Sequence, residues 1–523
     1  MTGQMTTQAR HGFDVDLVEA LLFVPVVHQG GPRRVTLAPF DGRPLVEIPL
    51  STAEDVDLAF ETGRPEQARW AGTDIADRRR AMLRFHDLLM THRDEGLDLI
   101  QWETGKTRMD ALKELLGVCA VARHYARDAQ RLLSSRRRFG VVPLLTGVTE
   151  ERRPVGLVGV LSPWNHPLYL ACADVIPAVM AGNAVVLNPD PRTSLTALWA
   201  IDLMHRAGIP RRVVQVVLGP QDELGPRIAG HADHVAFTGE RQLGARIAGL
   251  CGERMVSCSA QVGGSNVMVV AEDAHPGAAA EIAVRACFDN AGQMPVAVRR
   301  IYALAPVHDT FVERFLSRAG ALRMSADIGW GADVGSLLGA EQLAVTQAVV
   351  ERAVAAGARI LAGGHALPEV GPFYYAPTVL ADVPDDLDLS DGTPGPVVAV
   401  ERVGTVEEAV TRANAGPPML SATVVSASGR YGARIARRIE AGSVTVNEAY
   451  EAAAGSVRAP FGGAGRAGLG RRNGDQGLTR FTEEQTVAVQ RGLGFGTPFG
   501  MEHEDWGQFL VRGFQLLKWA RLK

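Results

Sequence analysis

Two glycines at a spacing suited to phosphate binding occur in the stretch ADHVAFTGERQLGARIAG. Gly239 and Gly244 form a G-x-x-x-x-G pattern where an apolar strand pattern ends and a helical pattern begins. Such a turn brings backbone N–H groups and the positive end of a helix against a pyrophosphate. A tight strand-to-helix turn without a ligand accounts for the same two glycines. The pattern alone does not decide between these two interpretations.

The cysteines offer thiol chemistry but no metal chemistry. None of them shows the CxxC spacing that a zinc site or a disulfide framework would need. We therefore expect no bound metal and a chain that works in a reducing, cytoplasmic compartment. The five cysteines are Cys119, Cys172, Cys251, Cys258 and Cys287.

The elements that must position these residues alternate along the chain. Short β-branched runs are separated by alanine-rich stretches with helical spacing, such as SLTALWAIDLMHRAG. Strands that are apolar throughout and separated by helices indicate a parallel sheet covered on both faces. Two such series, over 152–261 and 262–450, predict two α/β domains. The predicted strands are VGLVGVLSP, NAVVLNP, VVQVVLG, HVAFTG, SNVMVVA, ATVVSA and SVTVNEA.

Bulk properties exclude several classes of protein. The 523 residues suffice for two or three domains with real cores. The net charge of -4 provides no broad basic field, so we expect no nucleic acid partner. No apolar run reaches the roughly 18 residues that span a bilayer. The N-terminal stretch lacks the cleavage site of a secretory signal.

A family resemblance comes from motifs that follow one another in a fixed order. The segments SPWNHPLYLACADVIPAVMAGNAVVLNP, VAFTGERQLG, QVGGSN, NAGQMP and APFGGAGRAGLGR resemble those of aldehyde dehydrogenases. The resemblance covers residues 40 to 495 and is strongest to the actinobacterial succinate-semialdehyde dehydrogenase branch. It implies an α/β fold with a Rossmann-like cofactor domain, an α/β catalytic-type domain and a small β oligomerisation hairpin.

The same resemblance divides the chain. Residues 15–138 and 152–261 are expected to form the Rossmann-like domain, and 262–477 the catalytic-type domain. Residues 139–151 and 478–495 are expected to form the oligomerisation element. An amphipathic tail follows over 496–523.

The family's chemistry uses a cysteine thiolate that adds to an aldehyde, an oxyanion site and a glutamate base. The asparagine of the oxyanion site is retained as Asn165. The position of the nucleophile holds Pro295, which has neither a thiol nor an N–H to donate. The position of the general base holds Gln261, whose amide does not take a proton near neutral pH. The resemblance therefore predicts that the covalent reaction is lost.

The cofactor positions also depart from the family's pattern. Asn188 replaces a lysine that contacts the cofactor ribose, and Glu240 places a negative charge beside the expected pyrophosphate. Gly392 and Pro394 replace a glutamate and a phenylalanine that contact the nicotinamide end. We therefore expect a vestigial NAD(P) site that binds no cofactor tightly. Its residues are Trp164, Asn188, Gly239, Glu240, Gly244, Gly392 and Pro394.

These losses favour a catalytically inactive homologue that acts through binding, as a scaffold or as a regulatory partner of an active homologue. Two alternatives stay open. One is an enzyme with altered chemistry in the old aldehyde tunnel. The other is an NAD(P)-dependent aldehyde dehydrogenase of the succinate-semialdehyde type.

Several side chains allow two interpretations. Cys287 and Cys258 are either substitute nucleophiles or buried structural cysteines. His166 is either a base or part of the pocket lining. Asn165 either holds an oxyanion or caps local backbone.

Two surface features also allow more than one interpretation. The run Arg136 to Arg138 is either an anion site or a solvated edge of the interface in a homo-oligomer. The tail EDWGQFLVRGFQLLKWARLK is amphipathic and basic. It could pack on its own dimer, dock to a protein partner or lie on a membrane surface.

Overall fold

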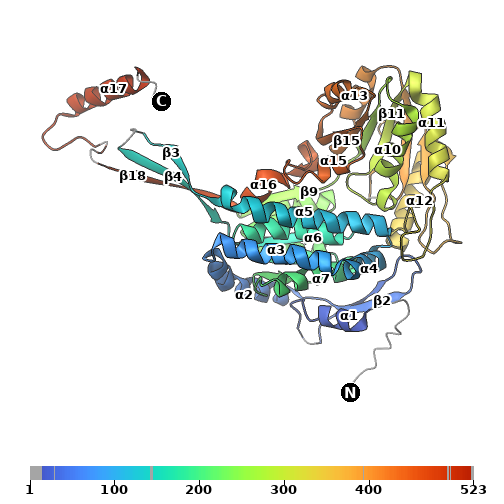
Figure 1. The fold of residues 1–523 in the computed structure, drawn as a ribbon, viewed down its shortest axis with the longest axis horizontal. Coiled ribbons are helices and arrows are strands. Elements are labelled where there is room, and N and C mark those ends of the chain that lie inside the picture. The colour runs from blue at the N-terminus through green and yellow to red at the C-terminus, as the bar shows by residue number, and fades with distance from the viewer. Residues whose placement is uncertain are drawn as a thin grey trace.

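The structure is a computed structural model, and it describes residues 14–28, 30–141, 145–392, 394–491, 494 and 496–519. Two α/β lobes lie side by side, and a narrow arm projects away from one of them (Figure 1). The last described segment of the chain lies beyond the end of the arm, far from the first described helix (Figure 1).

The first lobe is built on a six-stranded sheet whose order is β17-β9-β8-β5-β6-β7. All neighbours pair in parallel except β17 with β9. Alternate residues of a strand point to opposite faces. Val158 and Val160 accordingly join one buried cluster while Leu157 and Leu161 join another. The strands are β5 (Leu157–Ser162), β6 (Ala184–Pro189), β7 (Val214–Val216), β8 (His234–Thr238), β9 (Ser257–Gln261) and β17 (Gly468–Leu469).

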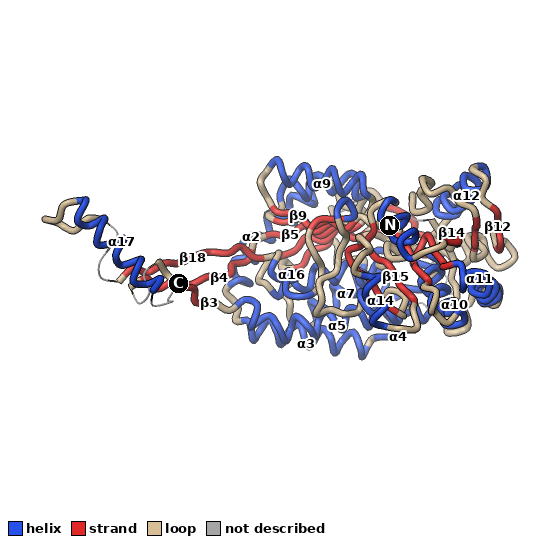
Figure 2. Tube along the Cα trace, turned by 90° about the horizontal axis from the view of Figure 1, so that it is seen from above, coloured by secondary structure: helices blue, strands red, loops and turns tan. Residues whose placement is uncertain are grey.

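Helices cover both faces of this sheet, which is why its strands are apolar throughout. Figure 2 shows α9 on one side of the strands and α3 and α5 on the other. The helices of this lobe are α1 (Val15–Leu21), α2 (Ala53–Ala71), α3 (Ile75–Thr91), α4 (Arg93–Thr104), α5 (Arg108–Leu133), α6 (Pro167–Met180), α7 (Ser194–Arg206), α8 (Gln221–His231), α9 (Arg241–Glu253) and α16 (Gly474–Thr479). A two-stranded sheet of β1 (Arg33–Leu37) and β2 (Pro44–Pro49) lies near α1.

The second lobe holds a seven-stranded sheet with the order β12-β13-β14-β11-β10-β15-β16. Only the pair of β12 and β13 is antiparallel. The strands are β10 (Asn266–Val270), β11 (Val298–Leu304), β12 (Arg359–Ala362), β13 (Thr378–Ala381), β14 (Val397–Val403), β15 (Met419–Val425) and β16 (Ala441–Val446). Its helices are α10 (Pro276–Phe288), α11 (Ala305–Gly320), α12 (Ala340–Ala355), α13 (Val406–Ala415), α14 (Gly429–Ala436) and α15 (Glu451–Ala454).

The arm is a three-stranded antiparallel sheet of β3 (Arg136–Phe139), β4 (Thr146–Pro154) and β18 (Thr482–Gln490), in the order β18-β4-β3. Arg136 to Arg138 therefore lie on an exposed edge strand. Helix α17 (His503–Trp519) lies beyond the arm in both views (Figures 1 and 2). The tail residues 520–523 lie outside the described residues. Among the described residues, no helix is long and apolar enough to cross a bilayer.

The predicted fold class is confirmed, with two mainly parallel sheets and an antiparallel arm. All seven predicted strands are present, as β5, β6, β7, β8, β10, β15 and β16. The exact division of the chain into domains stays a prediction.

Candidate active site

The carboxyl ends of β5, β6 and β8 form the edge of the first sheet at which its strand order reverses. From β5 the chain proceeds to β6 and β7 on one side, whereas β8 and β9 lie on the other. Ligands of open parallel sheets bind at such a switch point. Among the described residues, three buried oxygens at this edge lack a hydrogen-bond partner: Ser162 Oγ, Asn165 Oδ1 and Asn188 Oδ1. Buried polar atoms without partners are rare, so they indicate a place where a ligand or water would bond.

The first turn of α9 packs so closely against its neighbours that Gly244 has no room for a side chain. A Cβ atom on Gly244 would lie 2.6 Å from Val262 Cγ1 and 2.9 Å from the ring of Phe237. Glu240 is the N-cap of α9, but its side chain makes no capping hydrogen bond and is exposed. The first N–H groups of α9 are therefore not occupied by this side chain, and the positive helix end suits a phosphate.

Asn188 is the last residue but one of β6 and is fully buried. Its Nδ2 donates to the carbonyls of Val217 and Gly219, at 3.0 and 3.1 Å. The amide nitrogen thus ties two neighbouring segments, and only Oδ1 is left to accept a bond from a ligand such as a ribose hydroxyl.

Trp164 and Arg192 border the same edge. The guanidinium of Arg192 lies 5.6 Å from the Trp164 ring centroid. It donates to Asp190 at 2.8 Å and to Glu341 of α12 at 3.1 Å. Because Glu341 belongs to the other lobe, this ion pair bridges the two lobes. No feature of the sequence marked Arg192 in advance.

The segment after α10 turns sharply. Asn290, Ala291 and Gly292 all have positive φ values, of 52°, 51° and 72°. A Cβ on Gly292 would lie 2.5 Å from the carbonyl oxygen of Gly395, so only glycine fits this contact. This turn brings the carbonyl of the following residue, Gln293, into contact with Asn165 of the first lobe.

Arg299 fastens this turn to the segment that holds Gly392 and Pro394. The side chain is buried, and it donates to the carbonyls of Gly292, Pro394 and Gly395 at 2.7, 2.9 and 2.9 Å. Burial lowers the pKa of Arg299 to about 10. Gly392 has a φ of 73°, and its carbonyl accepts a bond from Gln342. The sequence reasoning missed Arg299, because a buried arginine bonded only to carbonyls has no local pattern.

The structure brings two of the predicted catalytic positions together. Asn165 Nδ2 donates to the carbonyl of Gln293 at 3.1 Å, so the amide does hold local backbone. Pro295 follows two residues later and is half-buried. Its carbonyl accepts a bond from Asn266 Nδ2 at 2.8 Å.

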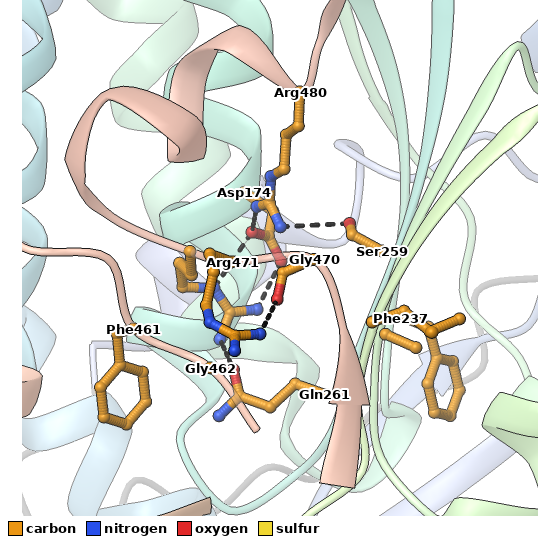
Figure 3. A pocket seen from close by; sticks show the side chains of 12 residues that line it. Asp174, Phe237, Ser259, Gln261, Phe461, Gly462, Gly470, Arg471 and Arg480 are labelled. Atoms are coloured by element: carbon orange, nitrogen blue, oxygen red, sulfur yellow. Dashed lines mark hydrogen bonds and ion pairs between the residues drawn. The ribbon is translucent and has the colours of Figure 1, made fainter. Parts of the chain in front are cut away.

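Gln261 lies at the end of β9 in a buried ionic network (Figure 3). Its Oε1 accepts a bond from Arg472 Nη1 at 2.7 Å, and Arg472 pairs with Asp174 at 2.6 Å. Burial alone would raise the pKa of Asp174, but Arg472 and Arg480 hold it well below its usual range. The pocket at Gln261 has only about 10 Å³ of space. Phe461 lines this pocket and also packs with Met294, which connects Gln261 to the segment around Pro295.

A second buried network lies behind Asn165. Lys106 Nζ donates to Glu114 Oε2 at 2.7 Å and to the carbonyl of Asn165 at 2.9 Å. Both charged side chains are fully buried. Burial would raise the pKa of Glu114, but Lys106 and His166 lower it to about 2. Glu114 Oε1 also accepts the N–H groups of Leu168 and Tyr169, which caps α6.

Cys287 and Cys258 are not suited to replace the missing nucleophile. Cys287 is fully buried in α10, and burial raises the pKa of its thiol far above the usual value. Cys258 is half-buried on β9, and contact with Cys251 together with burial raises the pKa of its thiol. Neither thiol would be a thiolate at neutral pH. Among the described residues, no three His, Cys, Asp or Glu side chains gather as metal ligands would.

Comparison with known proteins agrees with this fold. A family model described as the aldehyde dehydrogenase family matches residues 27–487. The chain belongs to the aldehyde dehydrogenase family.

Two relatives are named provisionally as NADP(+) succinate-semialdehyde dehydrogenases. The one from Mycobacterium ulcerans is 40% identical over 481 residues, covering 92% of this chain and 93% of the relative. The one from Mycolicibacterium smegmatis is 41% identical over 468 residues, covering 89% and 90%. The solved structure of an NAD-dependent aldehyde dehydrogenase from Sinorhizobium meliloti has a TM-score of 0.85 and 29% identity, covering 91% of this chain and 94% of that one.

The expectation of a vestigial site without tight NAD(P) binding is wrong. The relatives carry NADP(+) in their names, and the similar solved structure is of an NAD-dependent enzyme. From the sequence, each substitution was expected to remove a contact with the cofactor. Asn188 keeps an unpartnered acceptor, however, and the exposed carboxylate of Glu240 is solvated, which weakens its repulsion. The correction applies to the residues that were expected to form the vestigial site: Trp164, Asn188, Gly239, Glu240, Gly244, Gly392 and Pro394.

Proposed function

We propose that this protein is an NAD(P)-dependent oxidoreductase that converts a small aldehyde of the succinate-semialdehyde type to its acid. The observation that carries this proposal is the set of buried, unpartnered oxygens of Ser162, Asn165 and Asn188 at the switch point. A nucleotide with several hydroxyl groups is the kind of ligand that satisfies them. The names of the relatives support the substrate class and favour NADP(+).

Each part of this edge of the first sheet would have a role in holding the dinucleotide. The N–H groups at the start of α9 suit the pyrophosphate, and Ser162 and Asn188 suit hydroxyl groups. The cofactor, when bound, supplies an oxidised nicotinamide that accepts two electrons and a hydrogen from the substrate. Glu240 lowers the affinity for phosphate but does not block the site, because its side chain is exposed.

The acid must form without a thioester, because Pro295 offers no thiol. Proline also removes one N–H from the oxyanion site, and losing one such donor typically costs about 10²–10³ in rate. We therefore expect turnover well below that of an enzyme with the cysteine. Asn165 is the donor that remains near this point.

The test is a calorimetric titration with NADP(+) and then NAD(+), followed by an assay of NADPH formation from succinate semialdehyde. Ser162→Ala should weaken cofactor binding several-fold, because it removes one buried hydroxyl group. Thr445→Val is the matched control, since Thr445 also has a buried, unpartnered hydroxyl but lies in the other sheet. No heat with either cofactor would end the proposal.

A second candidate is a homologue that binds the dinucleotide and performs no reaction, as a scaffold or regulatory partner. Its support is that Gln261 is held by Arg472 and that Pro295 replaces the nucleophile. Cofactor binding without NADPH formation, at protein concentrations high enough to detect a slow enzyme, would favour this candidate.

We further propose a homo-oligomer assembled through the arm. The edge strand β3 is exposed along its whole length, and β18 is exposed over all but its first residue. Unpaired strand edges are normally covered. The five unbridged cysteines suit a cytoplasmic protein.

A further inference from the structure

His166 occupies an unusual place for an ionisable side chain. It is the N-cap residue of α6 and directly follows Asn165, whose side chain bonds the segment ahead of Pro295. Its Nδ1 lies 3.7 Å from Glu114 Oε2. About 20% of the side chain is exposed, and Nε2 has no hydrogen-bond partner among the described residues.

His166 and Glu114 are arranged like a general base and the carboxylate that orients it. Glu114 is fixed by Lys106 and by the N–H groups of Leu168 and Tyr169, so its position is rigid. In the tautomer that carries its proton on Nδ1, that proton would face Glu114 at 3.7 Å, and the lone pair of Nε2 would be the acceptor. The carboxylate then stabilises the imidazolium that forms when Nε2 takes a proton.

We propose that His166 is a catalytic base that takes a proton from the hydrated form of the aldehyde. This inference rests on the proposed oxidoreductase function. Aldehydes in water are partly hydrated, so the oxygen that becomes part of the acid is already attached to the carbon. Neither a thiol at 295 nor a carboxylate at 261 is then required.

The C–H bond of the hydrate breaks, and its electron pair leaves with the hydrogen to the oxidised nicotinamide. One hydroxyl O–H bond breaks, and the proton passes to Nε2 of His166. The C=O bond of the carboxylic acid forms from the oxygen that lost its proton. Asn165 Nδ2 donates one N–H to the carbonyl of Gln293, so its second N–H would be the donor to an oxygen of the same carbon.

The surroundings keep the imidazole ready to accept a proton. The groups that face His166 are Glu114 and Asp110 of α5 and Lys106 of the preceding loop. Burial and then the charge of Lys106 lower the pKa of His166, while the two carboxylates oppose this change. The side chain is therefore neutral at pH 7, as a base must be.

The first test compares wild type with His166→Gln and His166→Phe in NADPH formation from succinate semialdehyde. General bases contribute about 10²–10⁴ in rate, so kcat should fall by about 100-fold or more with KM changed only a few-fold. The wild-type rate should fall in acid as His166 takes a proton, and this acid limb should vanish in both variants. His124→Gln is the control, because burial lowers the pKa of His124 as it does that of His166. A His166→Gln enzyme with wild-type kcat and acid limb would overturn the inference.

A second test does not depend on turnover. The trifluoromethyl ketone analogue of succinate semialdehyde is hydrated in water and carries the same pair of hydroxyl groups. With NADP(+) present, it should bind the His166→Gln protein at least about tenfold more weakly than wild type. Equal binding would overturn the role of His166. Turnover by wild type together with equal binding would leave the proposed function intact. A wild type that neither turns over nor binds the analogue would overturn both proposals.

A third test follows the pH titration of His166 in the cofactor-free protein. Carbon-13 labelling of the histidine rings gives each ring a resonance, and the resonance of His166 is the one missing from His166→Phe. It should titrate below the ordinary range of histidine. A midpoint above pH 7 would mean a charged side chain under working conditions and would overturn its role as a base.

Discussion

Pro295 is the residue that most changes what this site can do. It removes a thiol and an N–H at once, and these two losses can be separated. Pro295→Ala restores only the N–H, whereas Pro295→Cys restores both. The half-buried position leaves a new side chain open to reagents.

We predict that Pro295→Cys raises the rate of NADPH formation from succinate semialdehyde at least about tenfold, because a thiol nucleophile adds a covalent route. Pro295→Ala should give a smaller gain. Mass spectrometry after iodoacetamide should show one more fast-reacting cysteine than in wild type. A cysteine variant that labels readily but turns over no faster would show that Gln261 or the cofactor position limits the reaction.

The pair of Lys106 and Glu114 gives a prediction about stability. Both side chains are fully buried, and breaking a buried pair from one side typically costs about 3–5 kcal/mol. Urea unfolding of Lys106→Met at pH 7 should show a loss of this size. Arg402→Gln, which breaks the exposed pair with Asp309, is the control and should change little.

The pH dependence of that loss follows from the lowered pKa of Glu114. A carboxylate whose folded-state pKa is about 2 stabilises the fold above its unfolded value of 4.5. That stabilisation is lost as the pH falls from 4.5 towards 2. The difference between wild type and Lys106→Met should therefore be constant from pH 7 to about 5 and shrink below it. A difference that grows in acid would contradict this assignment.

At the scale of elements, the proposed phosphate site lies at the start of α9. Its N–H groups attract an anion, and Glu240 at the N-cap opposes this attraction. The carboxylate is exposed, so its effect is screened by salt.

We predict that Glu240→Gln tightens NADP(+) binding several-fold at low ionic strength. The gain should shrink towards none in about 0.5 M salt, because screening removes the repulsion. Calorimetry at two salt concentrations measures both effects. Glu253→Gln, at the other end of the same helix, should leave affinity unchanged. An equal gain from both variants would point to net charge rather than to the helix end.

At the scale of the whole molecule, the structure is held together by contacts between residues that lie far apart in the sequence. Arg192 of the first lobe pairs with Glu341 of the second. Within the first lobe, Gln261 accepts a bond from Arg472, which lies far along the chain. The arm, in contrast, projects from the body with little of its own surface covered (Figure 1).

We predict that the arm holds the oligomer together. Val487 and Val489 on β18 are exposed, as is Phe139 on β3. Val489→Glu should lower the oligomeric mass measured by light scattering, because a buried, unpaired charge opposes association. Far-ultraviolet circular dichroism should stay unchanged. Val354→Glu, at another exposed valine away from the arm, is the control. An unchanged mass for Val489→Glu would place the interface elsewhere.

The sequence by itself determined the fold class, seven of the strands and the positions of the family's motifs. Apolar runs and glycine turns are local patterns, so they can be recognised without knowing what packs against them. The chemical identity of Pro295 and Gln261 was equally plain, since the absence of a thiol or a carboxylate does not depend on folding.

Only the tertiary structure decided where the polar side chains point. Whether Asn188 keeps a free acceptor depends on Val217 and Gly219, and the partner of Gln261 is 211 positions away. The contact of His166 with Glu114 likewise joins two helices. The expected loss of the cofactor site was wrong because each substitution was judged by residue type alone. Hydrogen bonds and burial are set by long-range packing, and one sequence does not reveal which distant groups will meet.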